Sequence, residues 1–285
     1  MFGIVGTIPE KDFPLTCGVV SLEKKEILVD GNRIPINRGT PAMIAAALET
    51  LNYLGKPAPF CYLVGDIGSG DGCRHLYKYL IEHITGFLFH TLALHYFQPE
   101  VNLFKQLLSS IDTFPVRPIL IADAGFMYVA KMGGDAASFD LFTPDAGELA
   151  YLADEKAPHP FYTRGFILHE DNQVPDLIKR AYLYKNASNY LLVKGATDYI
   201  ADKNGVIAKI NSPNIESLEA IGGTGDTLTG IVSALIASGM DIKESMINAS
   251  KINRQAGYYA QPTPATQIYD ITKHISRALD KVLRD

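Results

Sequence analysis

The sequence is poor in cysteine and contains neither a cluster of basic residues nor a long apolar run. Its three cysteines, Cys17, Cys61 and Cys73, are odd in number and form no Cys-x-x-Cys pair. This pattern argues against a disulfide framework and a structural zinc site, and it favours a reducing compartment. No apolar run approaches the ~18 residues that a membrane-spanning helix requires, so a membrane is not an expected partner.

The charge balance argues against nucleic acid as a partner. Lysine and arginine total 26 against 31 aspartates and glutamates, which gives a net charge of −5.

The first residues, MFGIVGTIPEKDF, lack the basic start and the apolar core of a signal peptide. With 285 residues, 47% of them hydrophobic, the chain can bury a large core. We therefore expect one cytoplasmic domain over residues 1–285.

Apolar segments typical of strands alternate with amphipathic segments typical of helices. Strands are expected within residues 59–65, 86–97, 117–125 and 189–196, helices within 38–55, 73–84, 99–111 and 176–186, a passage from strand to helix over 139–153, and an irregular segment over 155–175. A hairpin is expected over 199–210, with two helices at the C-terminus. The alternation predicts an α/β fold whose central, mostly parallel sheet has helices on both faces. Ligands of such folds bind beyond the carboxyl ends of the strands.

The N-terminal segment, residues 1–37, is expected to contain short strands. The stretch KEILVDGNRIPI places Asp30 and Gly31 between two apolar runs, which is typical of a hairpin turn. These small β elements are candidates for a lid or for the edge of a homo-oligomer. In the helix that follows, Thr40 is the expected N-cap and Pro41 the first helical residue.

Two glycine-rich loops are candidates for binding phosphate. The first, GDIGSGDG, follows a strand and precedes a helix, but its spacing is not Gly-x-Gly-x-x-Gly, and no Gly-x-x-x-x-Gly-Lys-Ser/Thr occurs in the chain. Asp66 and Asp71 would also repel phosphate. We therefore expect a turn or a wall of the substrate site here, with Gly65 and Asp66 as candidate substrate contacts.

The second loop belongs to the stretch IGGTGDTLTGIVSALIASG, in which apolar residues follow at helical spacing. The helix is expected to start near Asp226. The amides of Gly223, Thr224 and Gly225 therefore precede or enter its first turn. Unpaired amides and the helix dipole favour an anion there. Asp226 then has two interpretations, an N-cap or a general base that takes a proton from an attacking hydroxyl.

The motif GGTGDTLTG resembles the glycine-rich signature of the ribokinase-like superfamily. Its leading glycine pair and Asp-x-Leu-Thr-Gly end are most similar to the ATP/ADP-dependent NAD(P)H-hydrate dehydratases, kinase-like enzymes that phosphorylate a hydrated nicotinamide and then eliminate phosphate. The resemblance implies that Gly222, Gly223, Thr224 and Gly225 bind phosphate and that Asp226 is the catalytic base. It also implies ATP or ADP and Mg²⁺ as cofactors.

Further segments resemble the same family in the same order. LFTPDAGELAYL implies that Asp145 and Glu148 organise the metal, whereas the residues alone favour the simpler interpretation that Glu148 stabilises a helix start through its dipole. LLVKGATDYIA implies that Lys194 and Gly195 lie near the nucleotide, although Lys194 could also simply reach solvent. PILIADAG implies that Asp123 contacts substrate, and capping the next turn would explain it as well.

The first hundred residues depart from the dehydratases and resemble the sugar and nucleoside kinases of the same superfamily. HYFQP, beginning at His95, replaces the dehydratases' Gly-Pro-Gly-Leu-Gly loop. The kinase-like helix start implies substrate contacts from Arg38 and Gly39, and Asp30 is a candidate for a substrate hydroxyl. Topology alone suggests that Asn253 reaches an adenine base.

Three functions fit these features. The first is a dehydratase-like kinase, the second a plain kinase acting on a sugar, nucleoside or vitamin-like alcohol, and the third a nucleotide-binding module without turnover. Because both Asp226 and Glu148 are present, the third ranks last. All three take a small molecule as partner. The acceptor stays open, because the divergent N-terminal half supplies its contacts.

Overall fold

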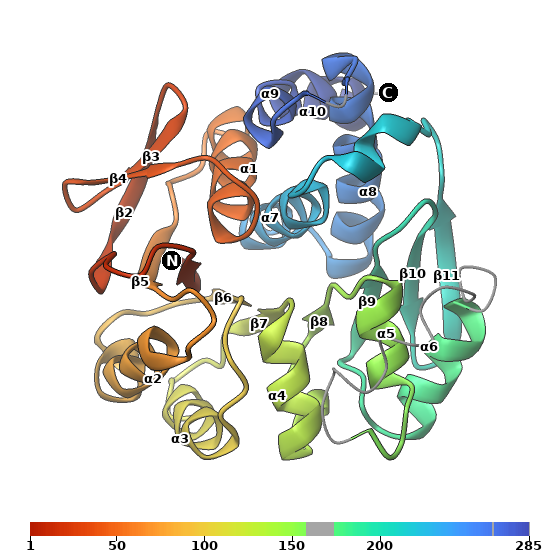
Figure 1. Ribbon diagram of the computed structural model, residues 1–285. Coiled ribbons are helices and arrows are strands. Elements are labelled where there is room, and N and C mark those ends of the chain that lie inside the picture. Colours follow the sequence, from red (N-terminus) through yellow and green to blue (C-terminus); the bar gives the residue numbers. More distant parts are fainter. Residues whose placement is uncertain (158–173, 264, 285) are drawn as a thin grey trace.

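A single 11-stranded sheet runs through the computed structural model, which describes residues 1–157, 174–263 and 265–284. Its strand order is β11-β10-β9-β8-β7-β6-β1-β5-β2-β3-β4 (Figure 1). The strands are β1 (Phe2–Ile8), β2 (Thr16–Glu23), β3 (Glu26–Val29), β4 (Asn32–Pro35), β5 (Phe60–Gly65), β6 (Thr91–His95), β7 (Ile119–Ala122), β8 (Leu141–Phe142), β9 (Tyr190–Val193), β10 (Asp198–Asp202) and β11 (Gly205–Ile210).

The middle of the sheet is parallel and its two ends are antiparallel. Strands β9, β8, β7, β6, β1 and β5 pair in parallel, while β10 and β11 extend one end and β2, β3 and β4 the other. The central strands are apolar because both of their faces are covered. Their carboxyl ends meet along one edge of the sheet, which positions the site described below.

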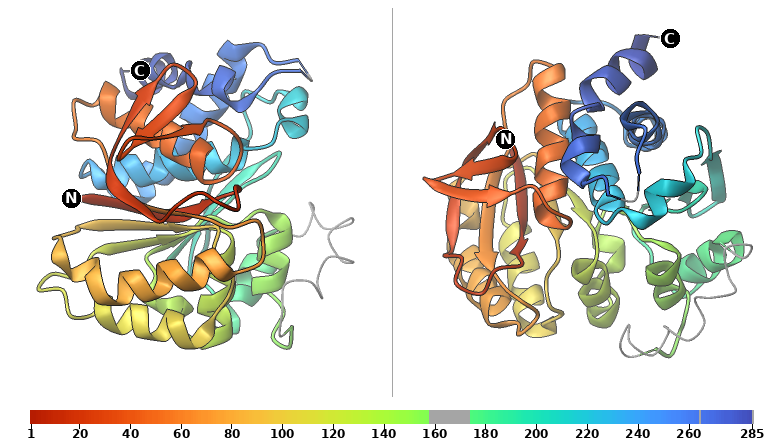
Figure 2. Two further views of the ribbon diagram at one scale, coloured as in Figure 1. Left: turned by 60° about the vertical axis from the view of Figure 1, so that its left-hand side comes forward. Right: turned by 45° about the horizontal axis from the view of Figure 1, so that its top comes forward.

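Helices cover both faces of the sheet, as the sequence predicts (Figures 1 and 2). The helices are α1 (Thr40–Tyr53), α2 (Asp71–His83), α3 (Val101–Ile111), α4 (Gly125–Gly133), α5 (Ala146–Leu152), α6 (Val174–Leu183), α7 (Thr224–Ala237), α8 (Ile242–Ala260), α9 (Ile268–Thr272) and α10 (Ile275–Arg284), with short 3₁₀ turns η1 (Ile84–Gly86), η2 (Ala136–Ser138) and η5 (Glu216–Ala220). Helices α1 and α7–α10 lie on one face and α2–α6 on the other. Each face has its own apolar core.

The N-terminal segment differs from the expectation of small hairpin elements in one respect. Strand β1 lies between β5 and β6 in the centre of the sheet, and all seven of its residues are buried. A lid or oligomer edge is therefore wrong for residues 2–8, whose apolar run on both faces is typical of a central strand. Strands β2–β4 do form one end of the sheet. Asp30 and Gly31 make the predicted turn, with φ of 45° and 77°.

The predicted helices are found with three corrections. Helix α1 has Gly39, not Thr40, as its N-cap, and the Thr40 hydroxyl is instead directed to His95. Helix α4 was not anticipated, and the C-terminus has the short α9 and α10 after α8 where two helices were expected. Residues 158–173 of the expected irregular segment lie outside the described residues.

Two expectations from composition concern the described part of the chain. Within the described residues, Cys17, Cys61 and Cys73 are free thiols, as their number and spacing predict. Among the helices that the structure describes, none combines the length and the apolar character needed to cross a membrane.

Helices α1 and α7 cross closely at Gly230, which gives a prediction about stability. A Cβ at Gly230 would lie 2.2 Å from the backbone oxygen of Met43. Alanine normally favours a helix by ~1 kcal/mol over glycine. Here we expect Gly230→Ala to lower the free energy of unfolding by about 1–3 kcal/mol, because two helix backbones must separate. Urea denaturation measures this change.

The matched control for Gly230→Ala is Gly86→Ala. A Cβ at Gly86 would meet nothing within 4 Å. Its effect on the free energy of unfolding should stay within ~0.5 kcal/mol. Equal stability of the two variants would contradict a tight crossing at Gly230.

Candidate active site

A cleft of about 480 Å³ lies where the carboxyl ends of the central strands face the start of α7. Its lining combines charged residues from strand ends and adjoining segments, among them Asp123, Asp145, Glu148 and Lys194, with the loop before α7. Small-molecule sites commonly have this size and combine a concave shape with a few convergent polar groups. The strand ends thus place the candidate residues together, as the fold class predicts.

The glycine-rich loop leads directly into α7. Gly223 is the N-cap, with φ of 107°, and the helix begins at Thr224. It therefore starts two residues before Asp226, which lies in its first turn. The first amides of a helix have no partner within it, so those of Thr224 and Gly225 suit an anion. The N-cap interpretation of Asp226 is wrong, because its carboxylate is directed to Gly39 and His95 instead.

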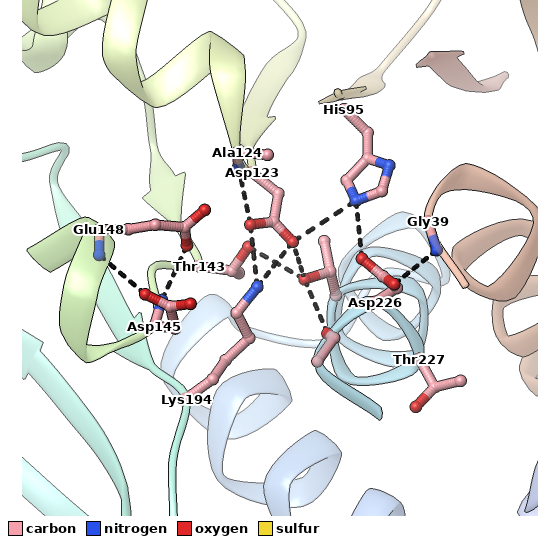
Figure 3. A network of polar contacts seen from close by, with 12 residues as sticks. Gly39, His95, Asp123, Ala124, Thr143, Asp145, Glu148, Lys194, Asp226 and Thr227 are labelled. Atoms are coloured by element: carbon pink, nitrogen blue, oxygen red, sulfur yellow. Dashed lines mark hydrogen bonds and ion pairs between the residues drawn. The ribbon is translucent and has the colours of Figure 1, made fainter. Parts of the chain in front are cut away.

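The Asp226 carboxylate is held by groups from two other elements (Figure 3). The Gly39 amide at the start of α1 donates to Oδ2 at 2.6 Å, and Nε2 of His95, at the end of β6, lies 3.2 Å from Oδ1. Only 8% of Asp226 is exposed. Burial opposes its charge, but His95, Lys194 and the Gly39 amide outweigh burial and lower its pKa. The lowered pKa favours the ionised carboxylate, which is the form that can accept a proton.

Asp123 and Lys194 form a nearly buried ion pair beside Asp226 (Figure 3). The Lys194 Nζ lies 2.9 and 2.8 Å from the two Asp123 carboxylate oxygens. The side chain of Lys194 is 12% exposed and that of Asp123 is 2% exposed. Thr229 donates to Asp123 at 2.6 Å, as does the Ala124 amide at 2.8 Å. Burial opposes the Lys194 charge, yet Asp123 and Glu148 raise its pKa overall. Lys194 therefore does not simply reach solvent. Asp123 pairs with a cation, and the amide that it bonds is that of Ala124, the N-cap of α4, which has no side-chain cap, so the capping interpretation of Asp123 is wrong.

Asp145 and Glu148 form a capping box at the start of α5. The Glu148 amide donates to the Asp145 carboxylate at 2.7 Å, and the Asp145 amide donates to the Glu148 carboxylate at 2.8 Å. Burial and the charge of Asp145 raise the pKa of Glu148 to about 8. Such a carboxylate is stabilised in its ionised form by a cation, and oxygen ligands of this kind suit Mg²⁺. The residues therefore fit the metal that the sequence resemblance implies, while the box also serves the helix.

The other predicted nucleotide contacts lie around the same cleft. Asn253 on α8 lines it, but its amide group already bonds the start of α7, accepting from the Thr227 hydroxyl and donating to the Thr224 oxygen. Gly195 donates to Asp198 and accepts from Arg254. The contacts of Asn253 stabilise the start of α7, and those of Gly195 stabilise the segment that follows β9.

The predicted acceptor contacts divide into two groups. Arg38 lies against the glycine loop, since a Cβ at Gly222 would come 3.2 Å from the Arg38 Cδ, and Gly39 contacts Asp226 directly. The structure does not bring Asp30, Gly65 or Asp66 to the lining of the cleft. Asp30 occupies the exposed β3–β4 turn.

Gly65 and Asp66 have structural roles instead. A Cβ at Gly65 would lie 2.1 Å from the Glu10 oxygen, so this glycine permits close packing of the segment after β1. The Asp66 carboxylate accepts from the amides of Gly68, Gly70 and Cys73. Burial opposes its charge, and these amides more than offset burial and lower its pKa. The first glycine loop is thus a turn, as its spacing predicts.

Sequence reasoning missed two residues that the structure places at the site. His95 has no predicted role at the site, yet its side chain is fully buried against Asp226. Tyr96 lines the cleft, is 49% exposed and has φ of 51°, which is rare for a tyrosine. The position of both residues at the carboxyl end of a buried strand was the available signal.

Comparison with known proteins identifies the fold and the family. The family model described as NAD(P)H-hydrate dehydratase matches residues 100–281. An uncharacterized protein of Methanocaldococcus jannaschii is 43% identical over 243 residues, covering 85% of this chain and 100% of the relative. An ADP-dependent (S)-NAD(P)H-hydrate dehydratase of Cenarchaeum symbiosum is 30% identical over 162 residues, 57% of this chain and only 50% of that relative.

Solved structures agree with the family match. An ADP/ATP-dependent NAD(P)H-hydrate dehydratase of Bacillus subtilis, crystallised with ATP and Mg²⁺, superposes with a TM-score of 0.59 at 14% identity, covering 99% of this chain and 92% of that one. The fold is therefore ribokinase-like, which confirms the predicted class. Within that class, the chain belongs to the NAD(P)H-hydrate dehydratase family and is an enzyme. A nucleotide-binding module without turnover is thus excluded.

Proposed function

We propose that this enzyme transfers a phosphoryl group from ATP or ADP to a hydroxyl of hydrated NAD(P)H and then eliminates phosphate. The observation that carries the proposal is the position of Asp226. Its ionised carboxylate lies in the first turn of α7, directly after the Gly222–Gly225 loop whose amides suit a phosphate. A base and an anion site are thus adjacent, which is the arrangement that phosphoryl transfer to a hydroxyl needs.

Each residue of the site would have a separate task in this reaction. The loop amides hold the transferring phosphoryl group, and Lys194, whose Nζ would lie about 3.6 Å from a Cβ at Gly225, adds positive charge beside it. Asp226 takes the proton of the acceptor hydroxyl as its oxygen bonds to phosphorus and the bond to the departing nucleotide breaks. Loss of the new phosphate, together with a proton from the nicotinamide ring, then restores the double bond.

Asp145 and Glu148 would hold Mg²⁺, directly or through water. When bound, the metal would neutralise phosphate charge. Both carboxylates line the cleft on the side of Lys194, away from Gly39. The ion would therefore lie on the nucleotide side of Asp226.

Charge-removing variants test the metal proposal without disturbing α5. Glu148→Gln and Asp145→Asn each keep an oxygen that accepts the partner's amide in the capping box. We expect Glu148→Gln to raise the Mg²⁺ concentration for half-maximal turnover about 10-fold or more, because it removes a negative ligand. Titration of Mg²⁺ at saturating nucleotide measures this. A Mg²⁺ requirement unchanged in both variants would contradict the assignment.

The acceptor is tested directly by incubating the protein with hydrated NADH, Mg²⁺ and either ATP or ADP. Recovery of the NADH absorbance, dependent on nucleotide, is expected. The comparison of ATP with ADP also identifies the donor. An absence of recovery with both nucleotides would contradict hydrated NADH as the acceptor.

A plain kinase is the second candidate, and one observation favours it. The family match begins at residue 100, whereas Gly39, His95 and Tyr96, which surround the acceptor side of Asp226, all precede it. The acceptor of this chain can therefore differ from that of its relatives. Release of ADP with a sugar, nucleoside or vitamin-like alcohol, together with no recovery of NADH, would establish this function.

A further inference from the structure

His95 makes a contact with Asp226 that the phosphoryl-transfer proposal does not itself require. The residue ends β6, between β1 and β7, and its side chain is completely buried. Nε2 lies 3.2 Å from the Asp226 Oδ1, and Nδ1 lies 3.0 Å from the Thr40 hydroxyl (Figure 3 shows the first contact). The imidazole therefore connects α1 to the candidate base on α7.

The chemistry of these contacts determines where the ring carries its hydrogen. An ionised carboxylate only accepts hydrogen bonds, so the hydrogen between the two side chains belongs to Nε2 of His95. In the neutral ring Nδ1 is then an acceptor, and Thr40 donates to it. The Thr40 hydroxyl thus donates to Nδ1 of His95, and the Nε2–H group of His95 donates to the Asp226 carboxylate.

The carboxylate of Asp226 consequently has a donor on each oxygen. His95 holds Oδ1, and the Gly39 amide holds Oδ2 at 2.6 Å. Two donors from different elements prevent rotation of the carboxylate about its Cβ–Cγ bond. One lone pair of each oxygen remains for the proton of a substrate.

We propose that His95 is a positioning residue, which uses its Nε2 hydrogen to orient the Asp226 carboxylate toward the acceptor hydroxyl. This inference rests on the assignment of Asp226 as the base. Because Nε2 already carries a hydrogen, His95 does not take the substrate proton itself. Its contribution is to aim the base, and a base misplaced by ~1 Å costs about 100-fold in rate.

Two isosteric variants separate the Nε2 donor from the bulk of the ring. A glutamine side chain can place an N–H group near the position of Nε2, whereas asparagine can reproduce only the position of Nδ1. We expect His95→Asn to lower kcat by about 10- to 100-fold with little change in the KM for nucleotide. His95→Gln should recover most of this loss.

A pH profile provides a readout that a purely structural role would not change. The His95 hydrogen bond helps to keep the pKa of Asp226 low. Its loss in His95→Asn should move the acid limb of kcat to higher pH, and His95→Gln should return it toward the wild-type position. Among the described residues, Asp123, Lys194 and Tyr96 also face Asp226, and both variants leave them in place.

Carbon-13 NMR of the whole 285-residue chain, with labelled aspartate carboxylates, tests the same effect on the pKa of Asp226 without turnover. The Asp226→Asn variant assigns the signal, which should titrate at higher pH in His95→Asn than in wild type or His95→Gln. Nitrogen-15 NMR of the wild-type imidazole should show the Nε2–H tautomer and needs no variant to fold. A neutral ring with its hydrogen on Nδ1 would overturn the proposal.

The outcomes distinguish this inference from the proposed function. If hydrated NADH is the wrong acceptor, wild type and variants are equally inactive, and the two NMR measurements decide the role of His95. If His95 does not position Asp226, then His95→Asn equals wild type in kcat and in the Asp226 titration. Equal impairment of His95→Asn and His95→Gln would also overturn the proposal, because the ring volume would then matter and the donor would not.

Discussion

Asp226→Asn is expected to lower kcat by about 10²- to 10⁴-fold while the affinity for nucleotide stays close to that of the wild type. The amide cannot take the proton of the acceptor hydroxyl, and positioned bases contribute rate factors of this size. Steady-state kinetics with Mg²⁺, nucleotide and hydrated NADH measure kcat. Calorimetric titration with nucleotide measures the affinity.

The structure makes asparagine a closer control than alanine at this position. Its oxygen can accept from the Gly39 amide, and its N–H₂ group can donate to His95 once the imidazole hydrogen moves to Nδ1. The buried polar groups therefore keep partners, so the fold should persist. Asp226→Ala should lose as much kcat but leave those groups unpaired. Near-normal turnover by either variant would refute Asp226 as the base.

The second large effect concerns stability. Lys194→Met is expected to lower the free energy of unfolding by about 3–5 kcal/mol, because the Asp123 carboxylate is left buried without its cation. Thr229 and the Ala124 amide still donate to Asp123, but neither neutralises its charge. Urea denaturation of the protein without nucleotide measures the loss.

A double-mutant cycle gives the control for this prediction. Combining Lys194→Met with Asp123→Asn removes both charges and leaves an amide that Thr229 can still contact. The double variant should therefore be more stable than the sum of the single changes predicts. Additive losses would show that Lys194 and Asp123 contribute independently, which the 2.8 Å contact argues against.

The glycine loop and Asp226 could be recognised from the sequence because the signal is local. Flexible residues, a carboxylate and an apolar helix follow one another within a few positions, and the structure confirms that loop and helix adjoin. The grouping of Asp123, Asp145 and Lys194 was also predictable. They follow separate parallel strands, and the carboxyl ends of parallel strands share one edge of the sheet.

Other parts of the site could not be read from the sequence. The sequence places the start of α7 only near Asp226, and the structure fixes it at Thr224, because a glycine with positive φ can stand at or before a helix start with little cost. The central place of β1 was missed, since a short apolar run looks alike in the middle of a sheet and at its end. The sequence suggests Asp66 as a candidate substrate contact, whereas its three amide donors show that it organises its own loop.

The sequence by itself determined the fold class, the glycine-rich loop proposed to bind phosphate and the carboxylate proposed to take the proton. Only the tertiary structure decided how that residue is held. Asp226 is bound by Gly39 from 187 residues away and by His95 from 131 residues away. Such contacts depend on the order of the strands and on the crossing of α1 and α7, which no local pattern contains. A carboxylate acquires its direction and its pKa from those neighbours. The candidate base could therefore be predicted from the sequence, but the groups that hold it could not.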